Sequence, residues 1–187
     1  MEKLKICINP GHGDFDSGAI GHNGTLEKNI NLFIAVPLAV ELQKLGHKVF
    51  LTRQSDKMTA KTVNEDLKHI VDTANNEKCD LLISIHQNSA ENVKASGTET
   101  FCYLKNRQGV TLSNAVQKFT TSFFKSLDRG IKDGSNLYVI RHSNMTSILI
   151  EVLFLSNPRE EKILNDKAKL MVYAKGLAAI VNANFKL

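Results

Sequence analysis

The feature that most constrains this chain is a regular alternation of two kinds of apolar segment. Short runs rich in β-branched residues have the length and content of buried strands, whereas longer segments carry apolar residues at helical spacing. The strand-like runs are Leu4–Ile8, Val49–Leu51, Leu81–Ile85, Leu137–Ile140 and Ile148–Leu155, and Gly97–Tyr103 alternates like a half-buried strand. The helical segments are Glu27–Leu45, Val63–Asn76, Leu112–Leu127 and Lys167–Asn182. This order predicts an α/β fold with a central twisted, mostly parallel sheet of about five to six strands and helices on both faces.

The size and composition of the chain favour one globular domain. A chain of 187 residues with 42% hydrophobic content can bury a core without disulfides or other cross-links. Neither an internal repeat nor a linker rich in Pro or Ser divides it, so we expect residues 1–187 to form a single domain. The three cysteines, Cys7, Cys79 and Cys102, are scattered, and we expect them to be free thiols in the core. Any metal site would therefore use histidines and carboxylates.

The net charge of +5 and the pI of about 9.1 favour anionic surroundings, which nucleic acid, membranes and bacterial cell walls all supply. The 24 basic residues are dispersed, and no stretch interleaves them with aromatic residues, so we expect no nucleic-acid partner. No stretch approaches the length of a membrane span, which predicts no membrane insertion. The amino terminus enters a strand without the apolar core of a signal peptide.

Polar residues follow or interrupt several of the predicted strands. His12 follows the first strand, His86 follows Leu81–Ile85, and Glu151 lies within Ile148–Leu155. Glu27 opens the first helix, after a glycine-rich loop. Because ligands in α/β folds bind at the carboxyl ends of strands, these side chains could converge in one cleft. A phosphate-binding loop is the alternative for the glycines, but neither Gly-x-Gly-x-x-Gly nor the Walker spacing is present.

Taken singly, His12 is more typical of a surface histidine and Glu27 of an ordinary first-turn acid. Together with His86 they make two histidines and a carboxylate, the ligand set of a hydrolytic zinc site with an open fourth position. Zinc lowers the pKa of its bound water to about 7, which creates a nucleophile at neutral pH. Glu151 lies in an apolar strand, so it is either paired with Arg141 or Lys132 or acts as a general base with a raised pKa.

Four sequence blocks together resemble the N-acetylmuramoyl-L-alanine amidases of the Amidase_3 family. They occur in the family's order and are Asn9–Gly13, Gly24–Asn29, Ser84–Asn88 and Ile150–Asn157. The resemblance implies one zinc ion held by His12, Glu27 and His86, with metal-bound water as the nucleophile and Glu151 as the catalytic acid and base. The bond cut would join the lactyl group of N-acetylmuramic acid to L-alanine in bacterial peptidoglycan, the expected partner of this chain.

The chain departs from the family pattern around the ligands. Asn9 replaces the usual aspartate, and we expect this change to weaken the orientation of His12. Ile70 replaces a usual arginine and touches no proposed ligand. Near Glu151, Leu153 replaces a usual glycine and Met145-Thr-Ser a usual Met-Pro-Ala, which puts substrate contacts in doubt. Asn88 and Arg141 are our candidates for substrate binding, Arg141 for a carboxylate of the stem peptide. Ordinary loop hydrogen bonds or an ion pair are the alternative for both.

Two other functions fit the same residues: a zinc peptidase acting on a different amide, and a wall-binding module that has lost activity. The presence of Glu151 argues against the inactive module. Without a leader, the chain fits the catalytic domain of a phage- or prophage-type endolysin better than an exported autolysin. We expect it to act in the cell wall after cytoplasmic synthesis, and a wall-binding domain could follow Leu187 in the natural protein.

Overall fold

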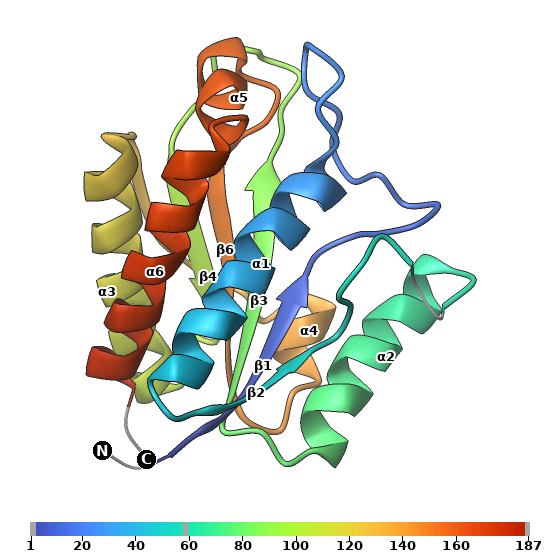
Figure 1. Cartoon of the computed structure of the whole chain (residues 1–187), viewed down its shortest axis with the longest axis vertical. Coiled ribbons are helices and arrows are strands. Elements are labelled where there is room, and N and C mark those ends of the chain that lie inside the picture. The colour runs from blue at the N-terminus through green and yellow to red at the C-terminus, as the bar shows by residue number, and fades with distance from the viewer. Residues whose placement is uncertain (1–2, 58–59, 186–187) are drawn as a thin grey trace.

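A six-stranded sheet in the order β2-β1-β3-β6-β4-β5 organises the computed structural model, which describes residues 3–57 and 60–185 (Figure 1). β2, β1, β3 and β6 are parallel, β4 is antiparallel to β6, and β5 is parallel to β4. The α/β fold and its mostly parallel sheet are therefore confirmed. The strands are β1 (Lys5–Pro10), β2 (Lys48–Leu51), β3 (Leu81–Asn88), β4 (Thr98–Cys102), β5 (Asp128–Asp133) and β6 (Thr146–Phe154).

Helices cover both faces of this sheet, as predicted. On one face lie α1 (Glu27–Lys44), α3 (Arg107–Phe124) and α6 (Lys167–Asn184), which pack against one another and against the strands. The opposite face carries α2 (Val63–Asn76) and the single turn α4 (Tyr138–Arg141). α5 (Pro158–Leu164) follows the carboxyl end of β6 (Figure 1). No helix in the described part of the chain is long and apolar enough to cross a bilayer.

Alternation along the central strands decides which side chains meet which helices. Ile8, Ile85 and Ile150 belong to the large core under α1, α3 and α6. Cys7, Leu82 and Leu149 belong to the smaller core under α2 and α4. Successive side chains of a strand point to opposite faces of the sheet. Three polar residues lie two positions after Cys7 or Leu149, or four after Leu82, so they project toward α2 and α4 as well. They are Asn9 of β1, His86 of β3 and Glu151 of β6.

The prediction of a strand at Leu137–Ile140 is wrong. This segment forms α4, and its residues Val139 and Ile140 are buried in the core under α2. An apolar run of four residues satisfies one helical turn as well as a strand, so its periodicity could not separate the two. All three cysteines are free and buried, as expected.

Two elements had no counterpart in the sequence prediction. β5 is an edge strand of sequence Asp-Arg-Gly-Ile-Lys-Asp with no buried residue, and charged edges of this kind lack the apolar signal of a core strand. α5 begins at Pro158, and the side chain of Asn157 caps it by accepting hydrogen bonds from the backbone N–H groups of Arg159 and Glu160. α3 also starts earlier than predicted, because Asn106 caps it through the backbone N–H of Gly109.

Candidate metal centre

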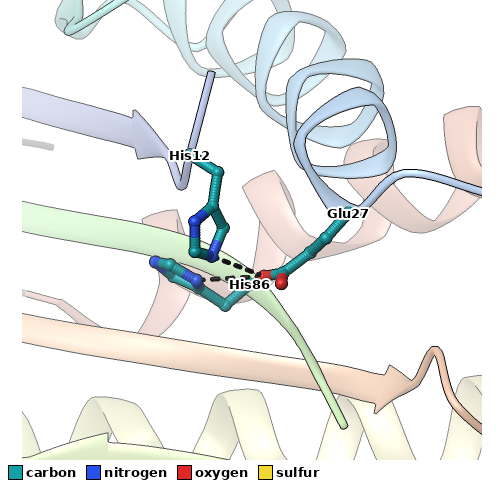
Figure 2. A group of neighbouring side chains, drawn as sticks. All are labelled: His12, Glu27 and His86. Atoms are coloured by element: carbon teal, nitrogen blue, oxygen red, sulfur yellow. Dashed lines mark hydrogen bonds and ion pairs between the residues drawn. The ribbon is translucent and has the colours of Figure 1, made fainter. Parts of the chain in front are cut away.

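The three predicted ligands converge at the carboxyl ends of β1 and β3 (Figure 2). Oε1 of Glu27, at the start of α1, lies 3.2 Å from Nε2 of His12 and 3.1 Å from Nδ1 of His86. A tetrahedral zinc ion with bonds of about 2.1 Å needs ligand atoms roughly 3.4 Å apart, close to both separations. The donor set and its spacing therefore fit a metal ion, and this group could hold one.

Two glycines make this close approach feasible. A Cβ on Gly11 would lie 2.3 Å from Nε2 of His86, so any other residue there would displace the ring. Gly18 has a φ of +63°, and its Cβ would lie 2.6 Å from Oε2 of Glu27 and 2.6 Å from the ring of His12. His12 itself adopts a φ of 63°, an uncommon conformation for a residue with a side chain. The glycine-rich loop is therefore shaped around the candidate ligands.

Surrounding donors fix the carboxylate of Glu27. Its Oε2 accepts a hydrogen bond of 2.8 Å from the backbone N–H of Ala19. Its Oε1 accepts bonds from the backbone N–H of Gln87 at 3.0 Å and from Nδ2 of Asn31 at 3.2 Å. Asn31 also donates to the carbonyl of Gly11 at 3.1 Å, which ties the helix to the loop. Sequence reasoning did not find Asn31 or Gln87.

Asp16 orients the ring of His12. Nδ1 of His12 lies 2.8 Å from Oδ2 of Asp16, whose Oδ1 accepts from the backbone N–H of Gly18. A carboxylate on Nδ1 fixes the tautomer that leaves Nε2 free for a metal. The expectation that Asn9 would weaken this orientation is corrected, because Asp16 supplies the carboxylate. Asn9 instead accepts a hydrogen bond from Ser84 and donates one to Thr52.

A buried arginine holds the same loop in place. Nε and Nη2 of Arg53 donate to the carbonyls of Pro10 and Gly11, and Nη2 also donates to Lys28 in the first turn of α1. Its Nη1 donates to the carbonyl of Ser55. Burial lowers the pKa of Arg53, yet its donors remain satisfied by backbone carbonyls. One side chain thus connects the end of β1 to the start of α1.

The charges of the group favour a cation at the point where the ligands meet. Burial alone would raise the pKa of Glu27, but hydrogen bonds from His12 and His86 outweigh it and hold that pKa far below its usual range. Burial would lower the pKa of His12, but Glu27 and Asp16 outweigh it and raise it to about 9. The carboxylates of Glu27 and Asp16 are ionised, and they favour positive charge at His12, carried either by a proton on the ring or by a metal ion in its place.

Glu151 stands beside this group without a partner of its own. It is the register partner of His86 across β3 and β6, and its Oε2 is buried with no hydrogen bond within the described residues. No ion pair joins it to Arg141 or Lys132 in the described chain, so that alternative is wrong. Burial raises the pKa of Glu151 to about 7, with the charges of Glu27 and Glu99 adding to the effect. A group with this pKa can both accept and donate a proton at neutral pH.

His12, His86 and Glu151 line a cleft of about 450 Å³ between α2 and α4, which we call the α2–α4 cleft. The sheet forms its floor and the two helices form its walls. The three candidate ligands His12, Glu27 and His86, which we call the metal group, lie beside it. Seven apolar side chains contribute to the lining. They are Val63, Leu67, Ile70, Phe101, Leu137, Val139 and Leu149.

Comparison with known proteins assigns this arrangement to a family. The Amidase_3 model, described as N-acetylmuramoyl-L-alanine amidase, matches residues 6–183. The chain belongs to the Amidase_3 family. Its enzyme class is accordingly that of the amidases, which are hydrolases, and its relatives include cell-wall amidases. The family suggested by the four sequence blocks is thus confirmed.

Individual Amidase_3 relatives differ in how much of their length this chain spans. It is 34% identical to the N-acetylmuramoyl-L-alanine amidase LytC of Bacillus subtilis over 90% of this chain, but it spans only 34% of LytC. It is 32% identical to the germination-specific N-acetylmuramoyl-L-alanine amidase of the same organism, covering 92% of this chain and 77% of that protein. Among solved structures, the CwlD amidase from Clostridioides difficile superposes with a TM-score of 0.91 at 30% identity, covering 97% of this chain and 98% of CwlD.

Neither of the two predicted substrate residues lines the α2–α4 cleft of this Amidase_3 chain. Nδ2 of Asn88 donates to Oε1 of Glu99 at 2.5 Å, and Asn88 does not line the α2–α4 cleft. Arg141 is exposed and lines a second cavity of about 820 Å³, which shares Asn136 with the cleft. The structure therefore groups His12, Glu27 and His86 with Glu151 beside them, and the substrate roles of Asn88 and Arg141 stay predictions.

Proposed function

We propose that this chain is a zinc-dependent N-acetylmuramoyl-L-alanine amidase that hydrolyses the bond between N-acetylmuramic acid and L-alanine in peptidoglycan. His12, Glu27 and His86 would hold one Zn²⁺. The observation that carries the proposal is the convergence of two imidazole nitrogens and one carboxylate oxygen beside the unpaired carboxylate of Glu151. Membership of the Amidase_3 family supports the choice of peptidoglycan as the substrate.

The donor chemistry favours a catalytic zinc ion. Two histidines and one carboxylate are the protein ligands of many hydrolytic zinc sites, and they leave one position open for water or substrate. When bound there, zinc supplies Lewis-acid polarisation of the scissile carbonyl and makes a coordinated water acidic. Asp16 would keep His12 in the ligating tautomer, and Asn31 with Gln87 would keep the carboxylate of Glu27 aimed at the site.

Glu151 would move the proton in this reaction. Its carboxylate takes a proton from the attacking water, and the water oxygen forms the new C–O bond at the amide carbonyl. The C–N bond then breaks, and Glu151 returns its proton to the leaving amine of L-alanine. The products are the free lactyl carboxylate of N-acetylmuramic acid and a peptide with a new L-alanine amino terminus. Its pKa of about 7 supports both halves of this cycle.

The roles of Asn88 and Arg141 also remain proposals. Asn88 would act on the substrate through Glu99, which it holds together with Arg129. Arg141 would bind a stem-peptide carboxylate that reaches past Asn136 into the second cavity.

We further propose that residues 1–187 act as one catalytic domain in the bacterial cell wall, after phage-type release. A likeness to the catalytic domain of the CD27L endolysin supports this location, with a TM-score of 0.79 at 28% identity and coverage of 98% of this chain and 99% of that one.

Digestion of purified peptidoglycan tests the proposed reaction. The protein is incubated with the wall with and without a chelator, and new amino termini and new reducing sugar ends are measured separately. We expect L-alanine amino termini to appear in parallel with loss of turbidity, and chelation to stop both. Amino termini other than L-alanine would indicate a peptidase acting on another amide. Wall binding without any new termini would indicate an inactive binding module, and new reducing ends would also contradict the proposal.

A further inference from the structure

The α2–α4 cleft differs in charge from the rest of the molecule. The chain carries a net charge of +5, yet none of the described residues that line this cleft is a lysine or an arginine. Apart from the histidines and Tyr138, the titratable residues of the lining are three acids, namely Asp16, Asp66 and Glu151. The cleft therefore presents negative charge to whatever enters it.

Of the three acids, only Asp66 has no partner and no part in the reaction proposed above. The carboxylate of Asp16 is occupied by His12 and by the backbone of Gly18. Asp66 lies in the first turn of α2 and is half-buried, and within the described residues no donor bonds its carboxylate. Arg53 contributes positive charge nearby, but the donors described for it point to backbone carbonyls.

The surroundings of Asp66 would strengthen its interaction with a cation. Leu67 and Ile70 follow it on α2, and Leu137 and Val139 line the opposite wall. Apolar walls lower the local dielectric constant, so a charge pair formed in the cleft is stronger than one at an open surface. The same walls suit the aliphatic part of a chain that ends in a charged group.

We propose that Asp66 is a specificity-determining residue that binds the side-chain ammonium group of a diamino acid in the stem peptide. The proposal rests on the amidase function proposed above. In stem peptides with lysine at the third position, an amino group at the end of an aliphatic side chain lies a few residues from the scissile amide. With that amide at the metal group, the lysine stem would run along the apolar wall and its ammonium group would reach Asp66.

Two matched substrates test this assignment: N-acetylmuramoyl-L-Ala-D-Glu-L-Lys with a free ε-amino group, and the same compound with that group acetylated. KM and kcat are measured for the wild type, for Asp66→Asn, and for Asp72→Asn as a control on the exposed part of the same helix. We expect the wild type and the control to bind the free amine with a KM about three- to tenfold lower. Asp66→Asn should give equal KM values for both substrates, with kcat on the acetylated substrate unchanged.

A merely structural role for Asp66, as a counter-charge for Arg53 or a favourable acid at the start of α2, gives a different result. In that case Asp66→Asn would lower activity on both substrates equally, or would keep the preference for the free amine, and the assignment would be overturned. If the wild type cleaves both substrates with equal KM, the assignment fails and the amidase function stands. If the wild type cleaves neither, the amidase function fails and the assignment with it.

Discussion

The two faces of the sheet carry different kinds of side chain, although the same strands form both. One face lies under α1, α3 and α6, and the other lies under α2 and α4. The first face packs a continuous apolar core, in which Ile85 and Ile150 are fully buried. The second carries a smaller core and, immediately above it, the metal group and the α2–α4 cleft. His86 directly follows Ile85, and Glu151 directly follows Ile150. Neighbouring residues of one strand therefore serve stability on one side and chemistry on the other.

This division predicts that substitutions on the two faces separate activity from stability. A change on the α2–α4 side should alter catalysis, metal affinity or pH dependence while the fold persists. A change on the other side should lower the free energy of unfolding and leave the chemistry of the folded molecules alone.

The largest effect is expected for Glu151→Gln. Glutamine keeps the shape of the side chain but cannot take a proton, so amidase activity on peptidoglycan should fall by about 10²- to 10⁴-fold. Zinc content should stay the same, because Glu151 is not among the candidate ligands. Glu91→Gln, at an exposed loop position, is the matched control and should retain full activity. Retention of more than a tenth of the activity by Glu151→Gln would remove it from the mechanism.

On the opposite face, Leu177→Ala should act on stability alone. Leu177 lies on α6 and is fully buried in the core, so the substitution leaves a cavity and should lower the free energy of unfolding by about 2–5 kcal/mol. Urea unfolding measures this loss, and kcat per folded molecule should not change. Leu149→Ala, which lines the α2–α4 cleft, is the counterpart and should alter KM as well. A loss of kcat in Leu177→Ala would show that the two faces are not separable.

Asp16→Asn tests whether the hydrogen bond to His12 contributes to zinc affinity on the α2–α4 side. The amide cannot supply the negative charge that orients Nδ1 of His12, so zinc affinity should weaken by about 10- to 100-fold. Competition with a chromogenic chelator measures the affinity. Asp14→Asn, on the same tight turn, should bind zinc like the wild type, because no described hydrogen bond involves its carboxylate. Equal affinities for the two variants would exclude the orienting role of Asp16.

The smallest effect concerns the pH dependence of stability in the chelated protein. Folding raises the pKa of Glu151 from 4.5 to about 7, so the folded state favours the protonated acid. The ionisation penalty is therefore absent below about pH 4.5, grows between pH 4.5 and about 7, and stays at its full value above that range. Glu151→Gln removes this penalty, and its stability relative to the wild type should increase by about 1–3 kcal/mol between pH 4.5 and pH 8. A constant difference across this range, measured by urea unfolding, would contradict the burial of an unpaired acid.

The fold could be predicted wherever the signal was a long periodic or continuous apolar run. The strands of β1, β3 and β6 and the helix Val63–Asn76 were of this kind. The prediction failed at Leu137–Ile140, where four apolar residues are too short to reveal a period, and at β5, where a charged edge strand has no apolar face. In both places the structure is decided by neighbours that are distant in sequence.

The candidate ligands and Glu151 could be predicted from the sequence, but the residues that support them could not. His12 and His86 lie near strand ends, Glu27 opens a helix and Glu151 interrupts an apolar strand, and the structure brings the four together. Their supports were missed, because a polar residue in a loop or on a helix gives no local signal of its partner. Asp16 bonds His12 across a tight turn between Gly13 and Asp16, and Asn31 reaches back one helical turn to Glu27.

Zinc titration of the chelated protein, followed by release of L-alanine amino termini from peptidoglycan, tests the central claim most directly. Activity should return in proportion to added zinc and stop rising at one equivalent per chain, and His86→Ala should recover none at that ratio. Activity that persists after full chelation, or that returns equally in His86→Ala, would contradict a single zinc site built from His12, Glu27 and His86.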